Sequence, residues 1–211
     1  MGFILGRYRP VRAQSNRTFG AWRFPKFQNR GEALVSHVLR SHFCTPDYHL
    51  MNHVTIQMDD GTTQVDHILV SRFGVFVIET KDFSGWIFAK ATDRTWTQTH
   101  FRLRFKFQNP IRQNYKHLLA VRGLLDFLPP DAIKSVVVFC GDAEFKTETP
   151  QGVFTLDKLV DYLNRENEKV ISLNRLQFCV GRLETARLAM SRQTDVEHVG
   201  RLARRFGADD D

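Results

Sequence analysis

The sequence feature that most constrains the fold is an apolar segment with a charged end, Gly-Val-Phe-Val-Ile-Glu-Thr-Lys-Asp-Phe at residues 74–83. Residues 75–78 are β-branched or aromatic and leave no polar face, which is typical of a strand covered on both sides. Glu79 and Lys81 follow two residues apart, so on a strand both side chains point to one face and Thr80 points to the other. The segment predicts a central strand with polar groups gathered at its end.

Hydrophobic periodicity elsewhere changes between helical and strand patterns. Helices are expected at residues 30–43, from Asn109-Pro110 to Pro129, and at 156–166, 175–190 and 196–206. Strands are expected at 53–70, as a hairpin around Asp60-Gly61, and at 75–81, 86–90, 95–100, 101–107, 135–140 and 152–154. This order predicts an α/β fold with a mixed central β-sheet flanked by helices and with C-terminal helices.

The chain has 211 residues, of which 42% are hydrophobic, enough for one medium-sized domain with its own core. No apolar run approaches the roughly 18 residues of a membrane-spanning helix. The apolar stretch at the N-terminus is too short for a secretory signal. Cys44, Cys140 and Cys179 lie far apart in apolar surroundings and are expected to be buried free thiols in a reducing compartment. These features lead us to expect a cytoplasmic protein.

Positive charge is concentrated at the N-terminus. The first 30 residues contain seven basic residues and no acidic one, and the remaining 23 basic residues equal the 23 acidic residues of the chain. A basic arm over residues 1–29 suits phosphate groups, those of a nucleic acid first and those of an anionic membrane surface second. The alternative is a solvated terminus without a binding role.

Residues 101–107, Phe-Arg-Leu-Arg-Phe-Lys-Phe, alternate apolar and basic side chains. On a strand, Arg102, Arg104 and Lys106 share one face and the apolar residues share the other. The pattern predicts either a half-solvated strand or a surface whose basic face contacts a phosphate backbone. Trp86 and Trp96 are interpreted as core or edge aromatics, with base stacking on one of them as the alternative.

The strand before residue 74 carries an acidic residue, Asp66, within an apolar run. The short connection at residues 71–74 would fold this strand onto the next one, and an antiparallel pairing could bring Asp66 beside Glu79. Converging carboxylate oxygens are what a divalent cation such as Mg²⁺ or Mn²⁺ prefers, and without one the two buried acids are costly to ionise. Lys81 beside the cation could orient water for attack on a phosphodiester. The alternative is a Glu79–Lys81 ion pair at a strand end, with Asp66 a surface charge.

A longer pattern surrounds these residues. It consists of Gly31-Glu32, the run TTQVDHILVSRFGVFVIETKDFSGWI at 62–87, a later tryptophan and Asn-Pro-Ile-Arg-Gln-Asn at 109–114. This pattern, within residues 30–125, resembles the nuclease-related domain (NERD) family, which is grouped with the PD-(D/E)xK endonuclease-like superfamily. The resemblance implies a restriction-endonuclease-like nuclease core, which we place at residues 30–168, followed by a C-terminal helical extension at 169–211.

The resemblance also implies roles for the residues of the strand motif. Asp66 and Glu79 correspond to the two metal-binding acids, and Lys81 corresponds to the lysine of the motif. The Thr80 backbone carbonyl is a further metal ligand in this interpretation. The proline of the short motif is replaced by Val65, a departure that is common in this family.

Two helical residues extend the implied site. Glu32 matches the acid on the first helix that often completes such sites, and Gln113 matches a polar residue on the helix that follows the strands. From the residues alone, Glu32 could be only a favourable acid at a helix N-terminus, and Gln113 an exposed polar residue. His67 should point to the sheet face opposite Asp66 and is interpreted as a packed histidine.

The resulting hypothesis is a divalent-metal-dependent nuclease that hydrolyses phosphodiester bonds, those of DNA first and those of RNA as the alternative. Its catalytic residues would be Glu32, Asp66, Glu79, Lys81 and Gln113. The alternative is a non-catalytic module that retains the fold and holds nucleic acid, or an anionic membrane, through the basic arm and the basic face of residues 101–107.

Overall fold

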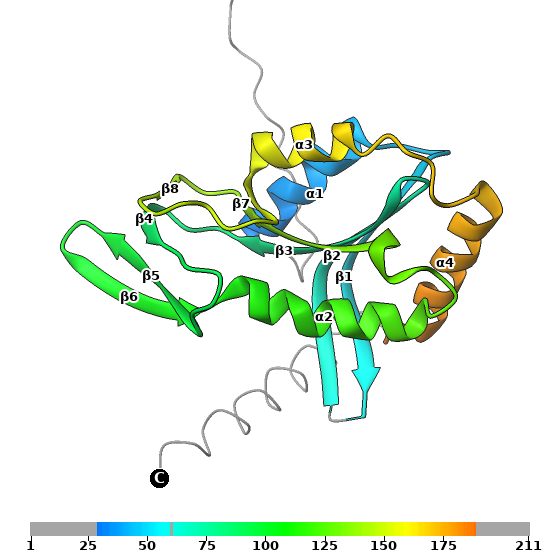
Figure 1. Ribbon diagram of the computed structural model, residues 1–211, viewed down its shortest axis with the longest axis horizontal. Coiled ribbons are helices and arrows are strands. Elements are labelled where there is room, and N and C mark those ends of the chain that lie inside the picture. The colour runs from blue at the N-terminus through cyan, green and yellow to red at the C-terminus, as the bar shows by residue number, and fades with distance from the viewer. Residues whose placement is uncertain (1–28, 60, 189–211) are drawn as a thin grey trace, which may run out of the picture.

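The computed structural model describes residues 29–59 and 61–188 (Figure 1), which form four α-helices, one short 3-10 helix and nine strands. The helices are α1 (Arg30–His42), α2 (Pro110–Leu124), η1 (Pro130–Ala132), α3 (Leu156–Arg165) and α4 (Leu173–Ala186). The strands are β1 (Tyr48–Met58), β2 (Gly61–Ser71), β3 (Gly74–Lys81), β4 (Gly85–Phe88), β5 (Thr95–His100), β6 (Leu103–Gln108), β7 (Ile133–Phe139), β8 (Ala143–Phe145) and β9 (Val153–Thr155). The basic arm, apart from Asn29, and the helix expected at 196–206 lie outside the described residues.

The central sheet has five strands in the order β1-β2-β3-β7-β9 and is mixed, as predicted. β1, β2 and β3 are antiparallel neighbours, and Gly61, at φ 140°, begins β2 after the predicted hairpin turn. β7 pairs in parallel with β3, and β9 pairs in parallel with β7. β3 therefore lies in the middle of the sheet with a paired strand on each side, as its apolar sequence predicts.

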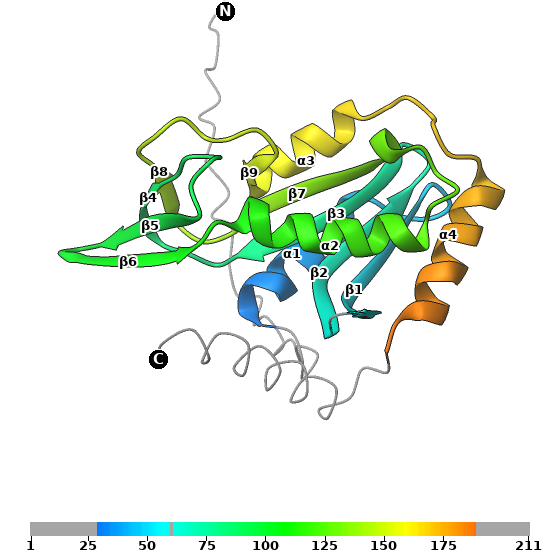
Figure 2. The same cartoon turned by 60° about the horizontal axis from the view of Figure 1, so that its bottom comes forward.

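Helices cover both faces of this sheet (Figures 1 and 2). Leu39 of α1 and Leu159 of α3 belong to the buried cluster on one face. Val121 of α2 and Leu183 of α4 belong to the cluster on the other face. The predicted α/β class with C-terminal helices is confirmed. Because α4 contributes to the same core as the strands, it is packed on the domain, while the boundary after residue 168 stays a prediction.

The remaining strands form a separate four-stranded sheet in the order β6-β5-β4-β8, which we call the wing. It projects from the domain beside the start of α2 (left in Figure 1). Ile87, Trp96 and Phe107 lie on one face of the wing and pack in a buried cluster with Phe139 of the central sheet. The sequence predicted three of these strands but not their separation from the central sheet.

The alternating segment at residues 101–107 is packed only at one end. Phe107 is partly buried, whereas Phe101, Leu103 and Phe105 are 91%, 63% and 50% exposed. The half-solvated strand expected from the sequence is therefore found only around Phe107. β6 is the edge strand of the wing and extends beyond the buried cluster, so both of its faces reach solvent over most of its length.

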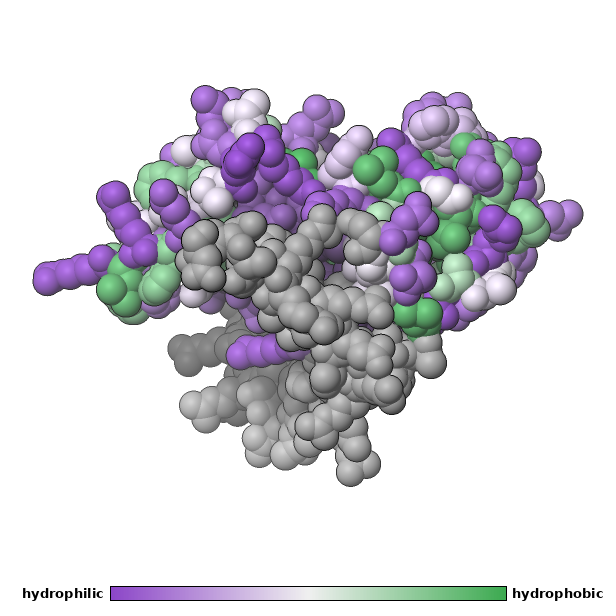
Figure 3. Space-filling view, turned by 90° about the horizontal axis from the view of Figure 1, so that it is seen from below, coloured by the Kyte–Doolittle hydropathy of each residue, from purple (hydrophilic) through white to green (hydrophobic). Residues whose placement is uncertain are grey.

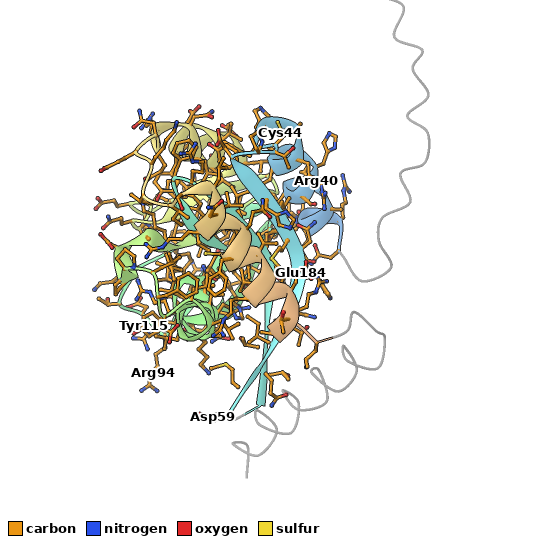
Figure 4. All side chains as sticks on the ribbon, turned by 90° about the vertical axis from the view of Figure 1, so that its right-hand side faces the viewer. Arg40, Cys44, Asp59, Arg94, Tyr115 and Glu184 are labelled. Atoms are coloured by element: carbon orange, nitrogen blue, oxygen red, sulfur yellow. The ribbon has the colours of Figure 1, made fainter. Side chains whose placement is uncertain are left out.

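Two expectations from composition have different outcomes. The three cysteines are free thiols, as expected, but Cys44 is exposed just after α1 (Figure 4) and Cys140 is only partly buried. The expectation of three buried thiols is therefore wrong, because apolar neighbours in sequence do not place a residue inside the core. Within the part of the chain that the structure describes, no helix is both long and apolar enough to cross a membrane.

Candidate active site

Asp66 and Glu79 face each other where the ladder between β2 and β3 ends. The last paired residues are His67 and Ile78, and one further step of the same register puts Asp66 opposite Glu79. Beyond the ladder, Asp66 Oδ2 accepts a hydrogen bond of 2.7 Å from the Thr80 backbone N–H. The Asp66 carboxylate thus accepts the hydrogen bond that a backbone carbonyl would accept if the ladder continued. The continued register places the two acids next to each other, as predicted.

Lys81 links two other predicted site residues. Its Nζ donates hydrogen bonds to Glu79 Oε1 at 2.7 Å and to Gln113 Oε1 at 3.0 Å. Gln113 lies in the first turn of α2, which begins after Asn109, whose side chain accepts a hydrogen bond from the Ile111 N–H. The alternation of β3 orients Glu79 and Lys81 to one side, and α2 brings Gln113 to them. The side chain of Gln113 is therefore a hydrogen-bond partner of Lys81 and not only a solvated polar group.

Glu32 lies in the first turn of α1 and is only 8% exposed. Asn29 caps the helix, because its Oδ1 accepts a hydrogen bond of 2.9 Å from the Glu32 N–H, and its Nδ2 donates back to Glu32 Oε1. Its negative charge also acts on Asp66 and contributes to raising the pKa of that carboxyl. Glu32 is therefore both a helix-terminal acid and an electrostatic neighbour of the strand acids.

Gly31 allows α1 to approach the end of β3 closely. A Cβ atom at this residue would lie 2.6 Å from Asp82 Cβ and 2.9 Å from Cys140 Sγ, too close for van der Waals contact. Gly31→Ala is therefore expected to displace the first turn of α1, and with it Glu32, and to lower the free energy of unfolding by about 1–3 kcal/mol. Denaturant unfolding measures this loss.

The matched control for this prediction is Gly123→Ala in α2. A Cβ atom at residue 123 would meet no described atom within 4 Å. The change should be neutral or should stabilise the protein by about 0.5 kcal/mol, because alanine restricts the unfolded chain. Equal stability of the two variants would show that the close approach of α1 at Gly31 is not a constraint.

His117 of α2 contacts Glu79, a contact that was not predicted from the sequence. Its Nε2 lies 3.2 Å from Glu79 Oε2, and its Nδ1 lies 2.6 Å from Thr63 Oγ1. His117 follows Gln113 by four residues, so helical periodicity places both on the side of α2 that faces the sheet. This spacing is the signal that could have found it.

His53 of β1 also lies at the site. In the register of β1 and β2 it is opposite Asp66, and its Nδ1 lies 3.6 Å from Glu32 Oε2. Its backbone has φ 55°, a left-handed conformation that is strained for a residue with a side chain. The row His53, Asp66 and Glu79 therefore crosses three neighbouring strands. We find no signal for the His53 backbone in the sequence.

Burial and local charges shift the two strand acids in opposite directions. Burial, together with the negative charges of Glu79 and Glu32, raises the pKa of Asp66 well above its ordinary value. Burial also acts against ionisation of Glu79, but the contact with His117 and the ammonium group of Lys81 outweigh it and lower the pKa of Glu79. Asp66 is therefore the acid that would gain most from an added positive charge.

His67 lies on the opposite face of β2, as predicted. Its side chain is fully buried, and its Nδ1 lies 2.8 Å from Asn52 Oδ1. Burial lowers the pKa of His67 to about 3, so the ring is neutral at physiological pH. His67 is therefore a packed, hydrogen-bonded histidine that supports β2 from behind Asp66.

The acids offer oxygen donors for a cation, but no preformed cluster of three ligands. In residues 29–59 and 61–188, no group of three or more His, Cys, Asp or Glu side chains is arranged to hold a metal ion. Glu32 Oε2 and Glu79 Oε2 are nevertheless buried, with histidine ring nitrogens as neighbours, His53 Nδ1 at 3.6 Å and His117 Nε2 at 3.2 Å. Carboxylate oxygens are hard donors, the kind that a divalent cation such as Mg²⁺ or Mn²⁺ prefers, so the chemistry of the acids suits such a cation although they are not arranged around one.

Comparison with known proteins shows a family and a relative that this chain resembles. Residues 28–140, more than half of the chain, match the family described as nuclease-related domain, NERD. An uncharacterized protein of Bacillus anthracis is 42% identical over 104 residues, a match that covers 48% of this chain and 49% of the relative. This chain thus spans about half the length of that relative. No solved structure matches this chain.

Proposed function

The chain belongs to the nuclease-related domain (NERD) family, and from this premise we propose that it is a divalent-metal-dependent nuclease that hydrolyses phosphodiester bonds of DNA. The observation that carries the proposal is the hydrogen-bonded row from Gln113 through Lys81 to Glu79, placed beside Asp66 at the end of a buried strand. A surface ion pair would not require burial of its acid, whereas Glu79 is only 2% exposed.

In this proposal Asp66, Glu79 and the Thr80 carbonyl hold Mg²⁺ or Mn²⁺. The bound cation would neutralise charge on the reacting phosphate and lower the pKa of a water molecule. Lys81, held between Glu79 and Gln113, keeps its ammonium group in place and donates hydrogen bonds to the attacking water or to a phosphate oxygen. Glu32 adds negative charge from α1, which favours retention of the cation.

Nucleic acid is the partner proposed for the surrounding surface. Arg102, Arg104 and Lys106 are exposed on the wing and offer contacts to phosphate groups. The basic arm at residues 1–29 would add sequence-independent attraction, with an anionic membrane as its alternative partner.

Lys81→Ala is expected to reduce metal-dependent cleavage by about 100-fold or more, because the variant lacks the ammonium group beside the reacting phosphate. The assay uses supercoiled, linear duplex and single-stranded DNA with Mg²⁺, with Mn²⁺ and with EDTA. Lys116→Ala is the matched control, because Lys116 is exposed on the same helix as Gln113 and this variant should cleave like the wild type. Absence of cleavage by the wild type with either cation, or equal cleavage by both variants, would refute the nuclease proposal.

A second candidate function is a non-catalytic nucleic-acid-binding module. The observation that favours it is that no three acidic, histidine or cysteine side chains of the described residues are arranged to hold a metal ion. This alternative predicts salt-sensitive binding that EDTA does not change, without cleavage of any substrate.

A further inference from the structure

One face of the wing carries aromatic and basic side chains in cross-strand rows. Trp86 of β4 pairs with Thr99 of β5, which pairs with Arg104 of β6. Phe88, Thr97 and Lys106 form the next row, two residues along each strand. Paired residues of a sheet point to the same face, so these six side chains share one surface, which we call the outer face of the wing.

Over β4 and β5 the outer face is the solvent side because the opposite face is packed, and over β6 both faces reach solvent. Ile87 and Trp96, which alternate with the outer residues, are 0% and 1% exposed in the cluster beneath the wing. On the outer face, Trp86 and Phe88 are 49% and 39% exposed. Two large, part-exposed aromatic rings therefore lie on strand β4, whose opposite face is packed in the buried cluster.

The charge of the outer face is positive. Arg104 and Lys106 are exposed, and β8 adds Glu144 beside Trp86, followed by Lys146, whose Nζ lies 4.7 Å from the centre of the Trp86 ring. Glu144 is paired with Lys146. Three basic residues and one acidic residue therefore surround the two rings. Two such faces would repel each other, which disfavours a second copy of this chain as the occupant.

Aromatic rings interleaved with cations match a polyanion that also carries planar groups. Exposed rings on a sheet stack on bases, and neighbouring Arg and Lys side chains contact the phosphates between those bases. Only unpaired bases offer their flat faces, so this chemistry selects a single strand over a duplex. Hydrophobic and hydrophilic residues lie side by side at the end of the molecule formed by β5 and β6 (left in Figure 3).

We propose that the outer face of the wing, built on Trp86, Phe88, Arg104, Lys106 and Lys146, binds single-stranded nucleic acid. The surface is close to the candidate active site, because Trp86 follows Lys81 by five residues and their Cα atoms lie within about 18 Å. The inference rests on the proposed function in one respect: the nucleic-acid strand bound to the wing is the substrate that extends to Lys81. Binding to the wing itself requires no cleavage.

Binding is tested with the full chain, in EDTA, by fluorescence anisotropy of a labelled 15-nucleotide oligothymidylate. Trp86→Ala is expected to weaken binding about 10-fold, because one stacking partner is lost. Trp86→Phe should retain most of the affinity, because it keeps an aromatic ring. Phe178→Ala on α4 removes an equally exposed ring, 56% exposed, outside the wing and should bind like the wild type. Thermal melts followed by circular dichroism confirm that each variant is folded.

A second readout uses intrinsic fluorescence. The chain has three tryptophans, at residues 22, 86 and 96, and Trp96 is buried. In a Trp22→Phe background, oligothymidylate is expected to quench the Trp86 signal, while a blunt duplex of the same length should quench it much less. Vesicles containing phosphatidylserine serve as the other anionic partner and should leave the signal unchanged.

Each outcome separates this inference from the nuclease proposal. Unchanged oligonucleotide affinity in Trp86→Ala, quenching by vesicles alone, or equal quenching by duplex and single strand would overturn the wing as a single-strand site, even if the wild type cleaves DNA. Loss of affinity in Trp86→Ala without any cleavage by the wild type would support the wing and refute the nuclease.

Discussion

Asp66→Asn is expected to abolish cleavage and, at the same time, to stabilise the metal-free protein. Asparagine retains the oxygen that accepts the hydrogen bond from the Thr80 N–H, so the end of β2 should keep its geometry. The variant loses the negative charge with which Asp66 would hold a cation, and cleavage should fall by about 1,000-fold. It also loses the repulsion from Glu79 and Glu32 that contributes to the raised pKa of Asp66.

The sign of the stability change follows from this raised pKa. In the unfolded chain Asp66 ionises near pH 3.9, as an ordinary aspartate does. In the folded protein it ionises only at higher pH, so the wild type loses stability as pH rises from the unfolded pKa to the raised folded pKa. Asp66→Asn has no such group. Its advantage over the wild type should therefore be small near pH 4 and grow to on the order of 1 kcal/mol at higher pH.

Urea unfolding at several pH values between 4 and 8, in EDTA, measures this difference. Asp126→Asn is the control, because Asp126 is exposed just after α2 and its charge should not change the pH dependence. Adding Mg²⁺ should then stabilise the wild type more than Asp66→Asn. A variant that is less stable than the wild type at every pH would show that Asp66 is a structural hydrogen-bond acceptor and not a strained acid.

The sequence was sufficient to predict the part of the site that depends on strand geometry. Alternation along residues 75–81 put Glu79 and Lys81 on one face, and the short connection at 71–74 implied an antiparallel partner. The register of β2 and β3 confirms both inferences. These are local rules, in which a side-chain direction follows from the backbone repeat and a short turn.

The apolar residues of α2 predict only part of its buried face: Leu118 and Leu125, which follow the helical pattern, are buried. Tyr115 and Leu119 fit the same helical pattern but are 54% and 45% exposed (Tyr115 is labelled in Figure 4). Asn114 and His117 are buried in their place. Their burial depends on polar partners in β2, β3 and β7, which are distant in sequence, so hydrophobic periodicity alone does not find them.

The sequence also did not predict the strained backbone of His53 or the separation of the wing from the central sheet. A left-handed conformation at His53 has no signal in composition, because the surrounding structure and not the residue type determines it. Three of the four wing strands, β4, β5 and β6, were predicted one by one. Their assignment to a second sheet depends on Ile87, Trp96 and Phe139, which meet only in the folded chain.

Asn114→Leu is expected to cause the largest loss of stability among these variants. Asn114 is fully buried, and its Nδ2 donates to the Val77 carbonyl at 2.8 Å, the Val136 carbonyl at 2.9 Å and Ser135 Oγ at 2.8 Å. Leucine is of similar size but leaves these buried acceptors without a side-chain donor. The free energy of unfolding should fall by about 2–3 kcal/mol, which lowers Tm by about 5 °C or more.

The same change should also weaken cleavage, because Asn114 fastens α2 to β3 and β7 next to Gln113 and His117. A helix that is held less firmly places Gln113 less accurately against Lys81, so we expect cleavage to fall even at temperatures where the variant is folded. Tyr115→Leu is the matched control, because it introduces the same residue one position later at an exposed site, and its unfolding free energy should change by no more than about 0.5 kcal/mol. If Asn114→Leu unfolded at the same temperature as this control, the hydrogen bonds of Asn114 would not be what fixes α2 on the sheet, and the position of Gln113 would have to depend on apolar packing alone.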